Sequence, residues 1–148
     1  MQSVEIHGLR QVQEAFERLP EAVRRAKAEV FEAVGEYLLE DVQNRIGGSG
    51  RVAGAQEYQV SSGKGYVAVR AKKETWLDGA AAGYVTNALE NGHAQTPGRY
   101  VPALGARLRR DRVPGKYMYQ ITGRREGPRM AEEAARRIEK AVLQELEK

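Results

Sequence analysis

The sequence predicts an α+β fold: an antiparallel β-sheet packed against a long N-terminal helix, with a C-terminal helix, in a single domain over residues 1–148. Apolar residues in 20–46 recur at steps of three and four, which is the spacing of one helix face. Residues 55–62 and 66–71 are typical of two β-strands, and a second helical stripe occupies 128–146. Neither helix buries its stripe alone, so the sheet and both helices are expected to pack together.

The chain is expected to begin with a short strand and a short helix. Residues 4–6 alternate between apolar and polar side chains, and Gly8 breaks this pattern. Residues 9–19 then carry one apolar helical face. Pro20 marks the predicted joint with the long helix, because proline is well tolerated in the first turn of a helix.

The long helix over 20–46 is expected to end at Gly47, since glycine adopts the left-handed conformation that closes many helices. Gly35 lies inside this helix and costs about 1 kcal/mol relative to alanine. We favour the interpretation that the helix simply tolerates this glycine over the interpretation that another element approaches the backbone closely there. Residues 47–54 contain four glycines in eight positions, which predicts a flexible loop.

A hairpin and a third helix are expected next. The sequence Ser-Gly-Lys-Gly at 62–65 is typical of the turn between two strands. Asp78 is expected to cap a helix over 79–91, and Gly92 to end it. The predicted buried face of that helix consists of Tyr84, Ala88 and Leu89.

The last third of the chain is expected to be a loop, a strand and a helix. Residues 93–115 are rich in proline, glycine and arginine and predict a second flexible loop. Residues 117–121 are typical of a strand, and Gly127 and Pro128 are expected to open the final helix. The apolar stripe of that helix consists of Met130, Ala134, Ile138, Ala141, Val142 and Leu146.

The composition is that of an ordinary soluble domain of 148 residues, with 41% hydrophobic and 30% charged side chains. The absence of cysteine excludes disulfides, thiolate metal sites and cysteine nucleophiles. The apolar runs are far shorter than a membrane span and the N-terminus lacks a signal-peptide pattern, so no membrane partner and a cytoplasmic site of synthesis are expected. A net charge of +4 permits contact with nucleic acid without requiring it.

No residue pattern predicts catalysis, a cofactor or a metal ion, so no enzymatic activity is expected. Glu90 and His93 are three residues apart and could share a metal ion, but zinc requires three or four ligands and no third one suggests itself. Packing at a helix end is the favoured interpretation of this pair. Trp76 precedes a predicted helix, where a hydrophobic staple is favoured over an exposed anchor for a partner.

Three stretches of the chain occur in an order typical of one family. The first, residues 4–26, places a short strand, a Gly-Leu pair, a short helix and a Leu-Pro pair before the long charged helix. The second and third contain the motif residues Tyr84, Glu90, Gly92, His93, Pro114 and Gly115. Together they resemble the HK97 gp10-like family of bacteriophage head–tail joining or tail-completion proteins. The chain departs from that family in the loop after the long helix, where Ser-Gly-Arg-Val at 49–52 replaces a common Thr-Gly-x-Leu.

The resemblance implies a structural protein that assembles as a ring, often hexameric, at the head–tail junction of a virion. It implies that the ring joins the head connector to the tail tube, and that the partners are further copies of the chain and these two neighbouring proteins. The implied location is the virion, and the host bacterial cytoplasm during assembly. The alternative function is that of a small basic nucleic-acid-binding protein.

Positive charge is concentrated in one segment. From Arg99 to Lys116, six cations and Asp111 give a net charge of +5, against +4 for the whole chain, so the remainder sums to −1. One interpretation is a solvated loop; the others are weak, sequence-independent contact with DNA in a ring channel and contact with an acidic rim on a neighbouring ring. The candidate contacts with DNA or an acidic partner are Arg99, Arg107, Arg109, Arg110, Arg112 and Lys116.

Overall fold

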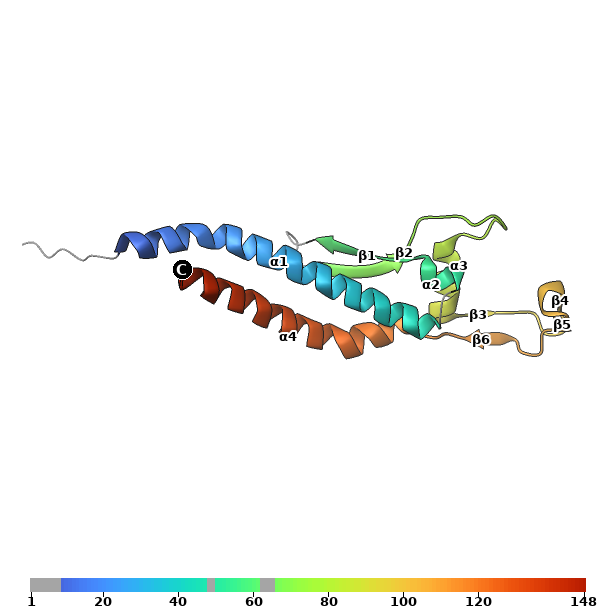
Figure 1. Ribbon diagram of the computed structural model, residues 1–148. Coiled ribbons are helices and arrows are strands. Elements are labelled where there is room, and N and C mark those ends of the chain that lie inside the picture. The colour runs from blue at the N-terminus through green and yellow to red at the C-terminus, as the bar shows by residue number, and fades with distance from the viewer. Residues whose placement is uncertain (1–8, 48–49, 62–65) are drawn as a thin grey trace, which may run out of the picture.

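Two long helices, α1 (Leu9–Ile46) and α4 (Met118–Leu146), run antiparallel and side by side along most of the molecule (Figure 1). The computed structural model describes residues 9–47, 50–61 and 66–148. The predicted strand over 4–6 and the predicted turn over 62–65 therefore lie outside the described residues. No helix in the described part of the chain is long and apolar enough to cross a membrane.

The strands form three separate antiparallel pairs rather than one sheet. The pair that packs on α1 consists of β1 (Gln56–Ser61) and β2 (Tyr66–Ala71). The predicted α+β class, with antiparallel strands against the long helix and a C-terminal helix, is confirmed. The remaining elements are α2 (Arg51–Gly54), α3 (Ala82–Asn91), β3 (Gly92–Ala94), β4 (Tyr100–Val101), η1 (Pro102–Leu104), β5 (Ala106–Arg107) and β6 (Arg112–Pro114).

Helix α1 is continuous across Pro20, so the predicted break between a short and a long helix is wrong. Pro20 is exposed, and residues on both sides of it tie α1 to the C-terminal helix. The Arg18 guanidinium lies 3.7 Å from the Glu145 carboxylate, and Ala22 is buried. These contacts offset part of the roughly 3 kcal/mol that proline costs inside a helix, since an exposed ion pair adds only about 0–1 kcal/mol. The helix ends at Ile46 as predicted, and the following glycine has a φ of +97°.

Gly35 is a point of close contact between α1 and the sheet. A Cβ atom at this position would lie 2.3 Å from Cδ2 of the Tyr58 ring, so the interpretation that the helix simply tolerates this glycine is wrong. The Tyr58 hydroxyl then donates a hydrogen bond to Glu32 at 2.8 Å. Only a residue without a side chain lets this aromatic ring rest on the helix backbone.

The segment predicted as a flexible loop over 47–54 contains the short helix α2 in its second half, and its flexibility stays a prediction. Ala53 is buried, and its carbonyl accepts a hydrogen bond from the Gln43 side chain at 3.1 Å. Val52 also packs against the core cluster and Ala55 is fully buried, so several contacts hold this turn despite its glycines.

The best-packed core lies where the C-terminal end of α1 meets the N-terminal end of α4. Met118 is fully buried in it, and Thr122, one helical turn later, is also buried. This burial explains why 117–121 begins a helix instead of forming the predicted strand, and why α4 passes through Gly127 and Pro128 instead of starting there. The core cluster consists of Val42, Ile46, Ala53 and Met118.

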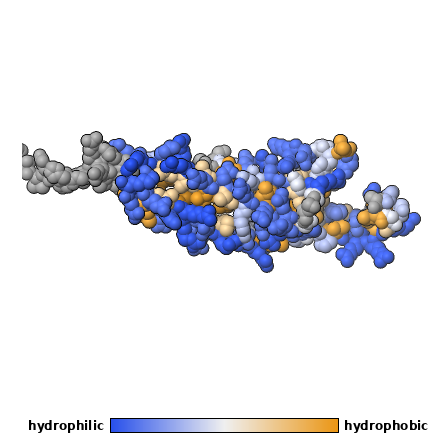
Figure 2. All heavy atoms as spheres, in the orientation of Figure 1, coloured by the Kyte–Doolittle hydropathy of each residue, from blue (hydrophilic) through white to orange (hydrophobic). Residues whose placement is uncertain are grey.

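The predicted apolar stripe of the C-terminal helix faces α1 along most of its length, and Figure 2 shows an apolar band where the two helices run side by side. Ala134 is buried, whereas Met130, Ile138, Ala141 and Val142 are half-buried. Leu146 is 40% exposed, so the stripe ends before the last turn that the sequence predicts.

Candidate partner-binding arm and its junction

Residues 92–115 form a narrow antiparallel ribbon, the arm, which projects from the end of the molecule where α1 terminates (Figure 1). Strand β3 pairs with β6 near the body, and β4 pairs with β5 near the tip. Between these pairs, the Gln95 N–H donates to Asp111 O at 2.9 Å and the Leu108 N–H donates to Arg99 O at 2.8 Å. The segment predicted as a loop over 93–115 is therefore a ribbon held by backbone pairing without an apolar core, and its flexibility stays a prediction.

Five arginines of the predicted basic segment lie exposed on the arm. Among the described residues, none of them forms an ion pair with a carboxylate; Arg107 donates to Gly98 O at 2.7 Å. With Asp111 they give the arm a net charge of +4, and a two-stranded ribbon has no interior in which to bury it. Figure 2 shows hydrophilic side chains projecting from the arm next to apolar atoms at its tip. The five are Arg99, Arg107, Arg109, Arg110 and Arg112.

Lys116, the sixth predicted cation, is already engaged within the chain. Its Nζ donates to the carbonyl of Ile46, the last residue of α1, at 2.8 Å. Its backbone N–H donates to Leu89 O at 2.8 Å near the end of α3. A cation at a helix C-terminus satisfies a carbonyl without an intrahelical partner and complements the helix dipole. Lys116 therefore joins two helix ends at the base of the arm.

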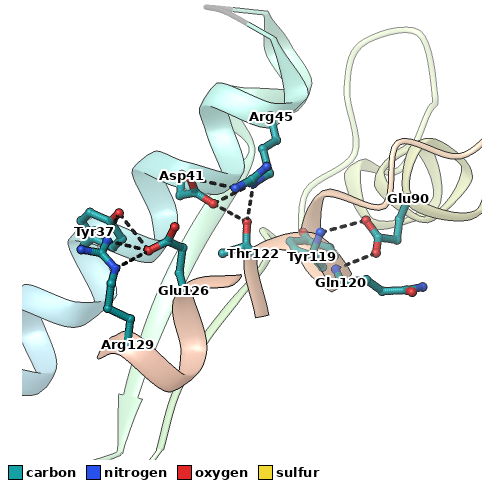
Figure 3. A network of polar contacts seen from close by, with 9 residues as sticks. All are labelled: Tyr37, Asp41, Arg45, Glu90, Tyr119, Gln120, Thr122, Glu126 and Arg129. Atoms are coloured by element: carbon teal, nitrogen blue, oxygen red, sulfur yellow. Dashed lines mark hydrogen bonds and ion pairs between the residues drawn. The ribbon is translucent and has the colours of Figure 1, made fainter. Parts of the chain in front are cut away.

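The Glu90 carboxylate caps helix α4 from the neighbouring helix α3 (Figure 3). Its two oxygens accept hydrogen bonds from the N–H groups of Tyr119, at 2.9 Å, and Gln120, at 3.1 Å. Tyr117, at the N-cap position, provides no side-chain cap and has a φ of +51°. Glu90 is only 6% exposed, so its charge is stabilised by two helical N–H groups that would otherwise lack partners.

Two glycines let the backbones of α3 and β6 cross in contact at the base of the arm. A Cβ atom on Gly115 would lie 2.2 Å from Glu90 O, and one on Gly92 would lie 2.4 Å from Val113 O. Gly92 ends α3 as predicted, with a φ of +77°, and is paired in register with Pro114. We call residues 89–92 and 114–120 the junction.

The junction brings together four of the six family-like residues: Glu90, Gly92, Pro114 and Gly115. Tyr84 lies apart from it and is 77% exposed on α3, whereas His93 directly follows Gly92 and is exposed on β3 opposite Val113.

The buried face of α3 agrees with the predicted one only in part: Leu89 packs against the core cluster and Ala88 is half-buried, but the most buried residues include polar ones that have partners. The buried residues Ala82, Thr86 and Glu90 recur every four positions. Thr86 Oγ1 accepts a hydrogen bond from the buried Gln56 side chain at 3.1 Å. Tyr84, predicted to be buried, points to solvent instead.

Asp78 and Trp76, which precede α3, both contact Arg51. The Arg51 guanidinium donates to Asp78 at 2.7 Å and lies 4.2 Å from the centre of the Trp76 ring. The hydrogen bond from Arg51 lowers the pKa of Asp78. The N-cap position of α3 is Ala81, so the predicted Asp78 cap is wrong.

Two polar clusters between α1 and α4 were not predicted from the sequence (Figure 3). In the first, Thr122 Oγ1 donates to Asp41 at 2.6 Å, and Arg45 Nε donates to Asp41 at 2.8 Å and to Thr122 at 3.1 Å. The spacing of four residues between Asp41 and Arg45 could have indicated their ion pair, but the contact with Thr122 could not be predicted because Thr122 lies far away in the sequence. The second cluster consists of Tyr37, Glu126 and Arg129.

Replacing Asp41 with Asn is expected to remove about 1 kcal/mol of stability at pH 7, with a smaller loss in acid. Burial raises the pKa of Asp41, but hydrogen bonds from Thr122 and Arg45 outweigh it, so the pKa lies below its ordinary value. A carboxylate with a depressed folded-state pKa adds stability above its unfolded pKa of about 3.9, and that stability disappears as pH falls through the folded value.

Thermal melts of the wild type and Asp41→Asn between pH 7 and strongly acidic pH measure this dependence. The difference in melting temperature is expected to shrink below about pH 4. Asp111→Asn, at an exposed position of the arm, is the control and is expected to leave the melting temperature nearly unchanged. A difference for Asp41→Asn that stays constant at every pH would contradict the assignment.

Comparisons of the chain with protein-family models, curated proteins and solved structures found no match. Across the described ranges, no three His, Cys, Asp or Glu side chains gather into a group able to hold a metal ion. The candidate site is therefore the arm, with its exposed arginines, together with the junction at its base.

Proposed function

We propose that the protein is a structural assembly protein of a phage virion, which joins the head connector to the tail tube as a ring at the head–tail junction. The observation that carries this proposal is the arm. It extends beyond the body and displays five arginines that have no carboxylate partner within the described residues. An element of this kind makes its main contacts outside its own subunit.

The junction adds a second line of support. The family-like residues Glu90, Gly92, Pro114 and Gly115 meet at the base of the arm, where they link it to the ends of α3 and α4. The resemblance in sequence therefore coincides with the part of the molecule that sets the direction of the arm. A fixed direction of the arm matters for a subunit that must reach its neighbour in a ring.

The chemistry of the arm suits contacts that form only when several subunits come together. Arginine is planar and permanently charged, and it binds carboxylates or phosphates through two parallel hydrogen bonds. Each exposed ion pair contributes only about 0–1 kcal/mol and is screened by salt. Several arginines acting together are needed for a stable contact, which prevents assembly at low concentration.

The free protein is expected to be a monomer, or a weak concentration-dependent oligomer, in dilute solution at physiological salt. Sedimentation velocity over a wide concentration range measures this, and electron microscopy of concentrated protein is expected to show rings. A tight dimer that does not respond to concentration and has two-fold symmetry would contradict the proposal, because such an interface closes on itself.

The alternative, a nucleic-acid-binding protein, is favoured by one observation at the tip of the arm. Tyr100 is 52% exposed and lies directly opposite Arg107 in the β4–β5 pair. An aromatic ring next to an arginine suits stacking on a base with contact to phosphate. A protein that stays monomeric at all concentrations and binds short duplexes strongly would favour this alternative over the ring.

A further inference from the structure

We propose that the arm of one copy docks on an acidic face of helix α1 in a second copy. This inference rests on the proposed ring assembly and names the contact that links its subunits. The acidic face consists of Glu29, Glu32, Glu36 and Glu40.

The four glutamates form a row on one side of α1, because they are three or four residues apart, and all four are exposed. Residues 28–44 contain these four acids and Asp41 but no lysine or arginine. In the described part of the chain, the hydrogen bond made to these four glutamates is the one that Tyr58 donates to Glu32. The row is therefore a helix face that carries several negative charges with no cation among them.

On helix α4, in contrast, acidic side chains are paired with arginines of the same helix. Its Glu133 accepts hydrogen bonds from Arg136 at 3.0 Å and from Arg137 at 2.9 Å, at spacings of three and four. On α1, the same spacings place glutamate next to glutamate, and such like-charged pairs are mutually destabilising. A cationic partner would relieve this repulsion on α1, whereas α4 relieves it internally.

The arm matches the acidic face in charge and in length. Its five arginines and one aspartate give +4, against −4 for the four glutamates. From Arg107 to Arg112 a fully extended chain spans at most roughly 17 Å. From Glu29 to Glu40 the helix also spans roughly 17 Å at the rise of an α-helix. Because successive side chains of an extended segment point to opposite sides, some of the arginines on the arm face the row of glutamates in this arrangement.

The two charged surfaces cannot meet within one chain. Lys116 Nζ binds Ile46 O, so the arm is anchored at the C-terminal end of α1, and it points beyond that end (Figure 1). Glu40, the nearest member of the acidic face, lies roughly 9 Å back along the helix from Ile46. The crossing of Gly92 and Gly115 fixes the exit of the arm in this direction. Docking must therefore occur between copies.

An arm on one copy and a helix face on the next make a head-to-tail contact. Such a contact uses two different surfaces, so an open chain of subunits keeps one free arm at one end and one free face at the other end until it closes. Closure gives a ring, in agreement with the proposed function. The second copy, rather than DNA or an unrelated protein, is the partner because the chain itself supplies a matching acidic surface.

Two charge-reversal variants test the docking. The arm variant carries Arg109→Glu, Arg110→Glu and Arg112→Glu. The face variant carries Glu29→Lys, Glu36→Lys and Glu40→Lys. Arg107 and Glu32 are left unchanged because each already makes a hydrogen bond within the chain.

Each variant alone is expected to self-associate at least about tenfold more weakly than the wild type at low salt, because its arm and its acidic face then carry like charges. An equimolar mixture is expected to recover association, with the two variants alternating. In that mixture the negative arm meets the positive face, and the unchanged arm meets the unchanged face. Sedimentation velocity of each variant and of the mixture measures this.

The control reverses two exposed charges elsewhere on the C-terminal helix and its end, with Glu139→Lys and Glu147→Lys. It is expected to change self-association by less than about threefold, and circular dichroism melts check that every variant is folded. Unchanged association of either charge-reversal variant, or a mixture that stays monomeric, would overturn the docking. An arm variant that loses binding to a short duplex but keeps self-association would also overturn it.

These outcomes are separable from a failure of the proposed function. A wild-type protein that stays monomeric at every concentration and at low salt would overturn the ring assembly itself. A wild type that forms rings while the arm variant forms them equally well would overturn only the docking of the arm on α1.

Discussion

Replacing Gly115 with alanine is expected to lower the free energy of unfolding by roughly 3 kcal/mol, a large effect for adding one methyl group. The new Cβ atom would lie 2.2 Å from Glu90 O, 2.7 Å from the carbonyl carbon of Asn91 and 2.8 Å from the Gly92 N atom. All three are backbone atoms, so no side-chain rotation relieves the clash. The end of α3 and the chain after β6 must therefore move apart.

That separation would break two further hydrogen bonds of the junction. The N–H of Lys116 donates to Leu89 O at 2.8 Å, and the N–H of Tyr117 donates to Glu90 O at 3.0 Å. Urea denaturation measures the loss of stability. Hydrogen exchange is expected to show faster exchange in the Gly115→Ala arm than in the wild-type arm, because its anchor on the body is weakened.

Gly123→Ala is the matched control, since it also adds one methyl group to a glycine. Gly123 lies exposed on α4, and no heavy atom outside its local helix lies within 4 Å of a Cβ atom placed there. This substitution is expected to stabilise the protein by up to about 1 kcal/mol, because alanine favours helix. A Gly115→Ala variant as stable as the wild type would show that the two backbones do not cross in contact.

The parts of the fold that could be predicted from the sequence are those set by local periodicity. The apolar spacing in 20–46 identified most of α1 and its end at Gly47, because a helix face repeats within a few residues. Both strands of the β1–β2 pair were found within a residue or two for the same reason. These signals need no knowledge of what packs against the element.

The helix starts predicted at the two prolines are wrong, because distant contacts decide whether a helix continues through a proline, whereas the start of α1 at Leu9 agrees with the predicted short helix. Pro20 and Pro128 both looked like first-turn residues, yet both lie inside helices. For α4, Met118 is buried against α1 and Thr122 donates to Asp41, which extends the helix ten residues before its proline. A local preference of proline cannot compete with such packing.

The paired strands of the arm could not be predicted for a different reason. A ribbon of two strands has no core to face, so its sequence has no reason to alternate apolar and polar residues. Its prolines and glycines therefore suggested a loop, although β3 pairs with β6 and β4 with β5. The arginines were correctly identified as a cluster, whereas the link from Lys116 to Ile46 depends on contacts between residues far apart in the sequence.

Replacing Glu90 with alanine is expected to cost roughly 2–4 kcal/mol, because it removes both acceptors at the start of α4. The N–H groups of Tyr119 and Gln120 would lose the carboxylate at 2.9 and 3.1 Å, and among the described residues no other side chain caps this helix end. Since Glu90 is 6% exposed, water would replace it poorly. The negative charge that opposes the helix dipole would also be lost.

The Glu90→Gln variant distinguishes the stability contributed by the hydrogen bonds from that contributed by the charge. Glutamine keeps the length of the side chain and one carbonyl oxygen, so it can accept from one of the two N–H groups but carries no charge. Its loss of stability is expected to be about half that of Glu90→Ala. Urea denaturation gives both values, and hydrogen exchange at Tyr119 and Gln120 reports the cap directly. If both variants match the wild type in stability and in exchange at these two amides, Glu90 does not hold the start of α4, and the junction cannot set the direction of the arm in the way proposed.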